Sequence, residues 1–147
     1  MTPSIGRRVA GASVVAMLAA AASASPAAAQ ARCAAPADPG WHSCLTASHR
    51  AIDDGRMIRL TKLQPRLVMR LEDGCPSGGD RRTVVIRTAG GDRIARARVD
   101  STCRRGIARW NITLDLDVEL RAGSVVRSFW SGIADNQKAP RVKLGAK

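Results

Sequence analysis

The stretch that decides the fold runs from Thr83 to Val99 and reads T-V-V-I-R-T-A-G-G-D-R-I-A-R-A-R-V. Its two halves alternate apolar and polar residues, which is the period-two pattern of a half-buried β-strand. Gly90 and Gly91 separate the halves and predict a two-residue hairpin turn, because glycine tolerates positive φ at both positions. The sequence therefore predicts an antiparallel β-hairpin here.

The predicted turn also fixes the register of the two strands. The expected pairs are Ile86 with Ala95 and Val84 with Ala97 on an apolar face, and Val85 with Arg96 and Thr83 with Arg98 on a polar face. Arg96 and Arg98 are consequently expected on the solvent side, as candidate binding residues.

Other segments show the same alternation and turn signals. Further strands are expected at 57–63, 66–72, 107–120, 124–131 and 141–144, with a turn at Ala122-Gly123. About seven strands of this kind favour an antiparallel β-sandwich of immunoglobulin-like or jelly-roll-like type, which we assign to residues 56–147.

The N-terminal part has a different composition. Residues 1–29 combine Arg7-Arg8, a short apolar run and Ala27-Ala28-Ala29, which together are typical of a secretory signal peptide. Residues 30–55 predict an irregular arm, with a candidate short helix that Ser43 would cap and that would end near Asp54. The protein is therefore expected to be secreted, with no membrane span and no lipid anchor.

Four cysteines remain after the signal peptide, and none is spaced as C-x-x-C. An even cysteine count in a short exported chain favours two disulfides over a zinc site. Cys75 and Cys103 flank the hairpin, whose register brings them close together. We therefore predict the disulfides Cys75–Cys103 and Cys33–Cys44, with no metal and no cofactor.

The chain is strongly basic. Without residues 1–29 it holds 22 Lys or Arg and 12 Asp or Glu, a net charge of +10. Such a charge favours association with anionic surfaces. However, 20 of the 24 basic residues are arginine and alanine is abundant, as a GC-rich bacterial genome would also produce. No nucleic-acid motif is present, so the expected partner is an anionic cell-envelope polymer or a secreted protein.

The stretch 111–120 reads N-I-T-L-D-L-D-V-E-L and places its acidic residues on one face of a strand. Asp115 and Asp117 would lie about 7 Å apart along that face, near the carboxyl separation of inverting glycosidases. Because any D-x-D in a strand does the same, a solvated face with ion pairs to Arg96 and Arg98 is the preferred interpretation. Calcium binding and hydrolysis are the alternatives.

Arg104 and Arg105 follow Cys103 directly, so a disulfide would brace the loop that carries them. Rigid loops of this kind present a residue to a protease in small secreted inhibitors, because preorganisation lowers the entropy cost of binding. The alternative is a plain connecting loop.

The aromatic and imidazole side chains are few. In the segment 124–131, Trp130 and Phe129 fall on opposite faces, so one of them is expected to be exposed, and Trp130 is the candidate contact residue. His42 and His49 are the only histidines. No nucleophile motif accompanies them, and a structural role is preferred.

These observations favour a secreted, non-enzymatic, basic binding module. The sequence does not determine its oligomeric state, and we expect a monomer or a weakly associating protein. Its candidate binding residues are Arg96, Arg98, Arg104, Arg105 and Trp130. A protease inhibitor that acts through Arg104 and Arg105 is the first alternative, and a hydrolase that uses Asp115 and Asp117 is the second.

Overall fold

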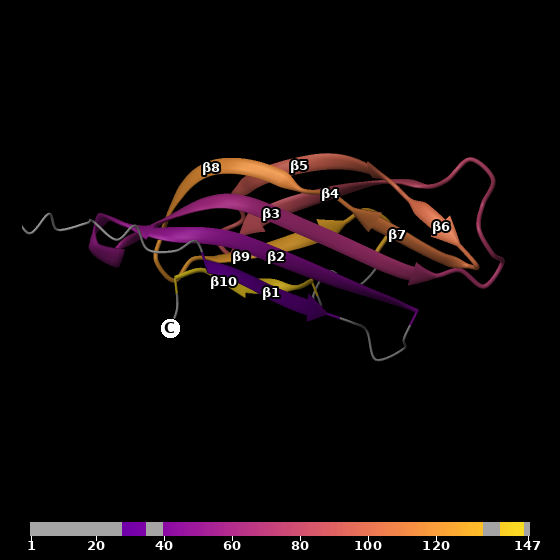
Figure 1. Cartoon of the computed structure of the whole chain (residues 1–147), viewed down its shortest axis with the longest axis horizontal. Helices are drawn as coiled ribbons and strands as arrows, with labels where there is room; N and C mark the ends of the chain where they lie inside the picture. Colours follow the sequence, from indigo (N-terminus) through magenta and orange to yellow (C-terminus); the bar gives the residue numbers. More distant parts are fainter. Residues whose placement is uncertain (1–27, 35–39, 134–138, 146–147) are drawn as a thin grey trace, which may run out of the picture.

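A computed structural model describes residues 28–34, 40–133 and 139–145, and it is built almost entirely from antiparallel strands (Figure 1). The expected signal peptide falls almost wholly outside the described residues. The strands are β1 (Ala28–Ala34), β2 (Trp41–Ile52), β3 (Met57–Arg70), β4 (Arg81–Thr88), β5 (Arg93–Asp100), β6 (Thr102–Arg104), β7 (Ile107–Asn111), β8 (Leu114–Arg121), β9 (Val125–Trp130) and β10 (Arg141–Lys143). A single 3₁₀ turn, η1 (Asp53–Gly55), joins β2 to β3.

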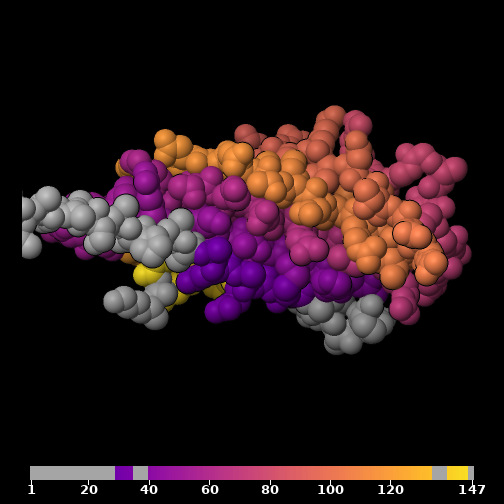
Figure 2. Space-filling view, viewed as in Figure 1, coloured from indigo at the N-terminus to yellow at the C-terminus, as the bar shows by residue number. Residues whose placement is uncertain are grey.

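The strands form two sheets that pack as a sandwich, as the sequence predicts. The first sheet, sheet I, has the order β1-β2-β3-β7-β6, and β8 pairs with β3 beyond the end of β7. The second sheet, sheet II, has the order β10-β9-β4-β5. Figure 1 shows sheet I in front of sheet II, and Figure 2 shows the outer face of sheet I with orange β8 along its upper margin.

The core lies between the two sheets and contains the inward-facing residues of both. Its fully buried members from sheet I and sheet II include Leu45, Leu60, Leu67, Trp110, Ile86, Val126 and Val142. Trp110 is the largest of these side chains. Its ring lies under the guanidinium of Arg82, 4.7 Å from the ring centroid, and its indole N–H donates to the carbonyl of Asp80 at 3.0 Å.

Strand β3 is central to sheet I and nevertheless contains a proline. Proline has no backbone N–H, so it cannot complete the hydrogen-bond ladder of a central strand. The ladder is interrupted at this point: β7 ends opposite Arg66, β8 begins opposite Leu63, and Pro65 lies between. Pro65 therefore explains why the predicted strand 107–120 is divided into β7 and β8, while the two strands predicted at 57–72 form one.

The hairpin register is confirmed, but the turn is longer than predicted. All four expected pairs are present, from Ile86 opposite Ala95 to Thr83 opposite Arg98. A register shift after Ile86 puts Arg87 opposite Arg93, and the loop closes with Thr88 N–H donating to Asp92 at 2.9 Å. Only Gly91 has positive φ, at 89°. This is a three-residue turn with a bulge, which absorbs one residue and leaves the register of the strands unchanged.

The predictions for residues 30–55 are wrong. No helix spans Ser43 to Asp54, because residues 43–52 belong to the 12-residue strand β2, in which alternate side chains from Ser43 to His49 are buried. Asp53 and Asp54 belong to the 3₁₀ turn η1. β2 pairs with β3 over its whole length, and β1 pairs with β2. Two of the buried side chains, Ser43 and His49, are polar, which hid the period-two pattern.

Both predicted disulfides are present. Cys33–Cys44 links directly opposed residues of β1 and β2, and Cys75–Cys103 links the β3–β4 loop to β6. Within the described residues, no helix has the length and hydropathy needed to cross a membrane.

Candidate anion-binding face

Four arginines lie in register across all four strands of sheet II. Arg93 of β5 is opposite Arg87 of β4, Arg87 is opposite Arg127 of β9, and Arg127 is opposite Arg141 of β10. Neighbouring strands are about 4.8 Å apart, so the four backbone positions span roughly 14 Å. We call these four residues the arginine row.

More cations surround the row on the same outer face. Arg96 is opposite Val85, which is opposite Phe129, and Arg98 is opposite Thr83. Lys143 follows Arg141 by two residues and therefore lies on the same side of β10. Arg96 and Arg98, both predicted as binding residues, are exposed on this face.

The middle of the face is apolar. The half-buried Phe129 lies next to Val85, and the guanidinium of Arg127 lies over the Phe129 ring at 5.2 Å from its centroid. A shallow depression of about 430 Å³ opens here, and it is lined by Thr83, Val85, Arg87, Phe129, Trp130 and Ser131. The face can therefore offer cationic contacts around an apolar centre.

In the part of the chain that the structure describes, the strands of sheet II contain one acidic residue, Asp100, and the hairpin loop contains Asp92. Asp100 is bound by Arg81 at 2.7 Å, and this hydrogen bond lowers the pKa of Asp100 and raises that of Arg81. Asp92, in the hairpin loop, forms no ion pair with another described residue. Like charges placed directly opposite each other across strands repel, so an anion bound along the row would relieve that repulsion.

Trp130 is not the exposed ring that was expected. Only 4% of its surface is accessible, and it belongs to the core together with Val126, which lies four residues earlier on the same face of β9. Phe129 points outward instead. The prediction that Trp130 is a contact residue is therefore wrong, and Phe129 takes its place in the candidate site.

The acidic side chains of β8 lie on the other sheet. Asp117 and Glu119 face outward on sheet I and bind Arg59 of β3 at 3.3 and 2.6 Å. The hydrogen bond that Arg59 donates to Glu119, followed by the charge of Asp117, raises the pKa of Arg59. The expected ion pairs with Arg96 and Arg98 are therefore absent among the described residues, because those arginines are on sheet II.

This geometry gives little support to acid catalysis by Asp115 and Asp117. The Asp117 side chain is 80% exposed and pairs with a guanidinium, whereas a general acid needs burial or a neighbouring like charge to raise its pKa. Asp115 is also exposed and lies opposite Lys62. Among the described residues, no group of three or more His, Cys, Asp or Glu side chains could hold a metal ion.

Arg104 and Arg105 lie at the turn between β6 and β7. Both are exposed, and the turn is held by the Cys75–Cys103 disulfide and by a 2.7 Å hydrogen bond from Leu71 N–H to the Gly106 carbonyl. Arg105 has φ of 52° and Gly106 has φ of 75°, so the chain reverses directly after Arg104. The loop is braced as expected, but the left-handed backbone at Arg105 offers no extended segment to a protease cleft.

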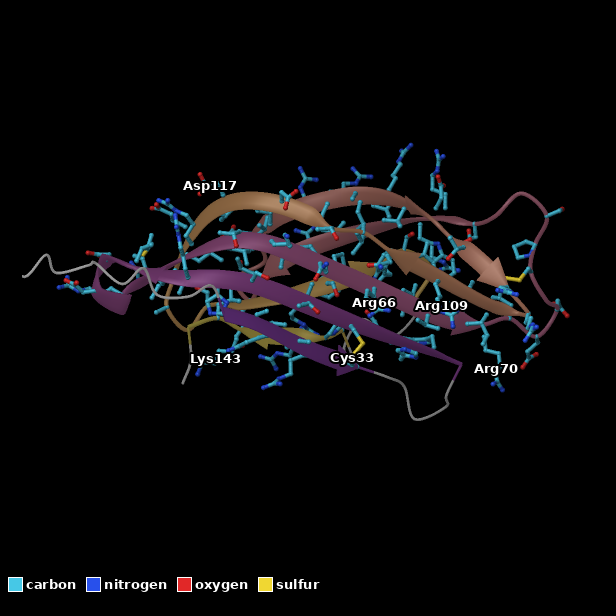
Figure 3. All side chains as sticks on the ribbon, in the orientation of Figure 1. Cys33, Arg66, Arg70, Arg109, Asp117 and Lys143 are labelled. Carbon is cyan, nitrogen blue, oxygen red and sulfur yellow. A yellow bond between two sulfur atoms is a disulfide. The ribbon has the colours of Figure 1, made fainter. Side chains whose placement is uncertain are left out.

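A second group of arginines, which sequence analysis missed, lies on the outer face of sheet I. Figure 3 shows Arg66, Arg70 and Arg109 on neighbouring strands towards one end of the sheet, with Asp117 towards the other end. Register places Arg109 opposite Val68 and Arg104 opposite Ile107, so Arg104 joins this group. These arginines thus lie away from Asp117, which pairs with Arg59 towards the other end of the same face.

The two histidines differ in environment. His42 is exposed on the outer face of sheet I. His49 is buried, its Nε2 accepts a hydrogen bond from Gly145 N–H at 3.1 Å, and burial lowers its pKa. His49 therefore connects β2 to the C-terminal segment as a neutral imidazole.

Comparison with known proteins adds one distant likeness. No family model and no curated protein matches the chain. Among solved structures, it is similar to the variable domain of the AgI/II polypeptide BspA of Streptococcus agalactiae, with 16% sequence identity and a TM-score of 0.30. The match covers 92% of this chain and 94% of that domain. A likeness at this level does not bear on function.

Proposed function

We propose that the protein is a secreted, non-enzymatic binding module that holds an anionic polymer of the cell envelope on the outer face of sheet II. The observation that carries this proposal is the arginine row, in which four guanidinium groups extend from directly opposed positions on four strands. The basic composition alone does not require such a concentration of charge.

Arginine suits this task because its planar guanidinium group forms paired hydrogen bonds with phosphate, sulfate or carboxylate groups. A polymer that runs across the strands would meet one cation about every 4.8 Å. Phe129 and Val85 would contact its apolar parts between the charged groups. The affinity should come mainly from charge and should therefore fall steeply as salt increases.

A retention assay tests this function. Purified, oxidised protein lacking residues 1–29 is mixed with isolated bacterial envelope at low and high salt, and the bound fraction is measured. We expect retention at low salt and release at high salt. If the protein instead stays bound to a single protein partner at high salt, the proposal is overturned in favour of the protease inhibitor.

Substitutions identify the surface that is responsible for retention on the envelope. The variant Arg87→Gln/Arg93→Gln/Arg141→Gln removes three charges from the row and leaves the contact between Arg127 and Phe129 intact. The matched control Arg50→Gln/Arg56→Gln/Arg121→Gln removes three exposed charges elsewhere. We expect only the first variant to lose retention, and equal loss in both would show that net charge alone is responsible.

A further inference from the structure

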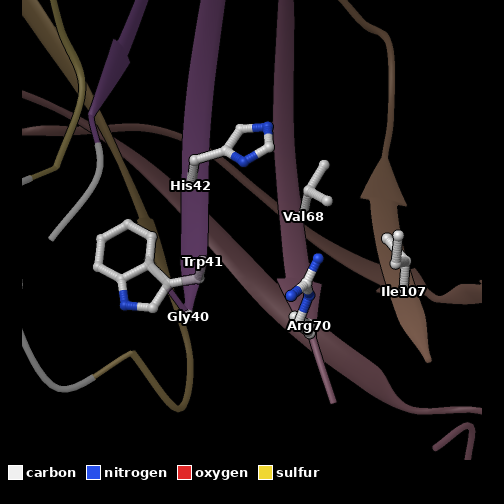
Figure 4. Close-up of a pocket in the computed structure, with 6 residues that line it drawn as sticks. All are labelled: Gly40, Trp41, His42, Val68, Arg70 and Ile107. Carbon is white, nitrogen blue, oxygen red and sulfur yellow. The ribbon is translucent and has the colours of Figure 1, made fainter. Parts of the chain in front are cut away.

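A pocket on the outer face of sheet I lies on the opposite side of the sandwich from the arginine row. It has a volume of about 360 Å³ and is lined by Gly40, Trp41, His42, Val68, Arg70 and Ile107. Figure 4 shows that His42, Val68 and Ile107 come from three neighbouring strands and that Arg70 lies at one margin. Five of its six lining residues thus belong to the strands β2, β3 and β7, and Gly40 directly precedes β2.

Strand register explains the composition of the pocket. His42 of β2 is opposite Val68 of β3, and Val68 is opposite Arg109 of β7. In the next row, Arg70 is opposite Ile107, which is opposite Arg104. The aliphatic side chains of Val68 and Ile107 therefore alternate with guanidinium groups, and an apolar floor is bordered by arginines.

Arg70 lines this pocket, and Arg104 and Arg109 lie beside it, opposite the lining residues Ile107 and Val68. The side chains of Arg70, Arg104 and Arg109 are exposed, and none of them forms an ion pair or hydrogen bond with another described residue. Glu72 and Asp73 follow Arg70 closely in the chain, yet neither pairs with it. An apolar floor with unpaired guanidinium groups at its margin matches a ligand that has an apolar body and a negative end.

We propose that this pocket binds a small anion that carries an apolar ring, such as an aryl phosphate or aryl carboxylate. The ring lies on Val68 and Ile107 beside the His42 imidazole, and the anionic group is held between Arg70 and Arg109. This site is independent of the arginine row, because it lies on the other sheet and shares no residue with it.

Phenyl phosphate is the direct probe, with inorganic phosphate and benzyl alcohol as the matched compounds that lack the ring or the charge. Binding is measured by titration while the methyl resonances of Val68 and Ile107 are followed. We expect phenyl phosphate to bind roughly tenfold or more tightly than either matched compound, because charge-assisted hydrogen bonds and apolar burial each contribute. Equal affinity for inorganic phosphate would overturn the proposed floor, and equal affinity for benzyl alcohol would overturn the role of the arginines.

Variants separate this site from the polymer site. Arg70→Gln and Arg109→Gln should each weaken phenyl phosphate binding by roughly tenfold, the worth of one charge-assisted hydrogen bond, and should leave envelope retention unchanged. The control Arg141→Gln should leave phenyl phosphate binding unchanged. If Arg70→Gln and Arg141→Gln weaken it equally, the probe senses general positive charge and the proposed pocket is wrong.

Discussion

Arg141 lies directly opposite Arg127 across the ladder between β10 and β9, although both side chains carry a positive charge. Like charges in directly opposed positions destabilise a sheet by a few tenths to about 1 kcal/mol. The two guanidinium groups repel each other in the free protein, and an anion bound between them would reduce that repulsion. Replacing an arginine of the row should therefore raise the stability of the free protein and weaken anion binding.

The variant Arg141→Thr tests this relation. It replaces one arginine with a residue that is favourable in strands and removes the repulsion with Arg127. We expect the free energy of unfolding of the free protein to rise by up to about 1 kcal/mol, while polymer affinity falls. Urea unfolding gives the free energy of unfolding, and polymer titration gives the affinity. A decrease in both quantities would mean that Arg141 stabilises the fold.

His49 should make the protein less stable in mild acid. Burial lowers the pKa of the folded imidazole below its ordinary value near 6.5, so the unfolded chain binds the proton more readily. The stability that His49 contributes is therefore present above pH 6.5 and is lost as the pH falls below it. Protonation of Nε2 would also break its hydrogen bond with Gly145 N–H.

The control for this effect is His49→Gln, whose side-chain oxygen can accept the same hydrogen bond without titrating. Unfolding free energies measured between pH 7.5 and 5.5 should fall in the natural protein and remain nearly constant in the variant. Parallel curves for the two proteins would assign the acid sensitivity to other groups.

The hairpin turn offers a matched pair of glycines. Gly91 has φ of 89°, and no atom lies within 4 Å of the position where a Cβ would be added. Gly91→Ala should therefore destabilise through backbone strain alone, by about 1 kcal/mol. Gly90 has no positive φ, so Gly90→Ala should be neutral or stabilising by a few tenths of a kcal/mol. Equal effects at both positions would support the symmetrical two-residue turn instead.

The two disulfides should differ in what they stabilise. Their cysteines are 11 and 28 residues apart, which corresponds to about 3 and about 3.5 kcal/mol in the chain-entropy estimate. Cys33–Cys44 links only the edge strand β1 to β2, so Cys33→Ser/Cys44→Ser should mainly increase hydrogen exchange in β1. Cys75→Ser/Cys103→Ser should lower the midpoint of global unfolding.

Local patterns in the sequence were sufficient for part of the fold. The register from Thr83 to Arg98 and both disulfides followed from alternation, glycines and cysteine positions. β2 was missed because its buried positions include Ser43 and His49, whose polarity interrupts the apolar alternation. Alternation also could not determine which of Phe129 and Trp130 faces the core, since that depends on the opposing sheet.

The candidate site was only partly predictable for the same reason. Arg87 and Arg93 belong to one hairpin, but Arg127 and Arg141 join them only because β9 pairs with β4 and β10 pairs with β9. Arg70 and Arg109 likewise come to neighbouring strands of one face only because β3 pairs with β7. Sheet order is a long-range property, and the local patterns of these strands do not contain it.

The central claim is tested most directly by the salt dependence of binding to long-chain polyphosphate. Affinity is measured from low to physiological salt for the natural protein, for Arg87→Gln/Arg93→Gln/Arg141→Gln and for the control Arg50→Gln/Arg56→Gln/Arg121→Gln. We predict that the row variant binds more weakly than the natural protein. Its slope of log affinity against log salt concentration should be shallower by about two to three, roughly one for each lost phosphate contact. The control should match the natural protein in both respects. Identical slopes and affinities for the two triple variants would contradict the arginine row as the binding site.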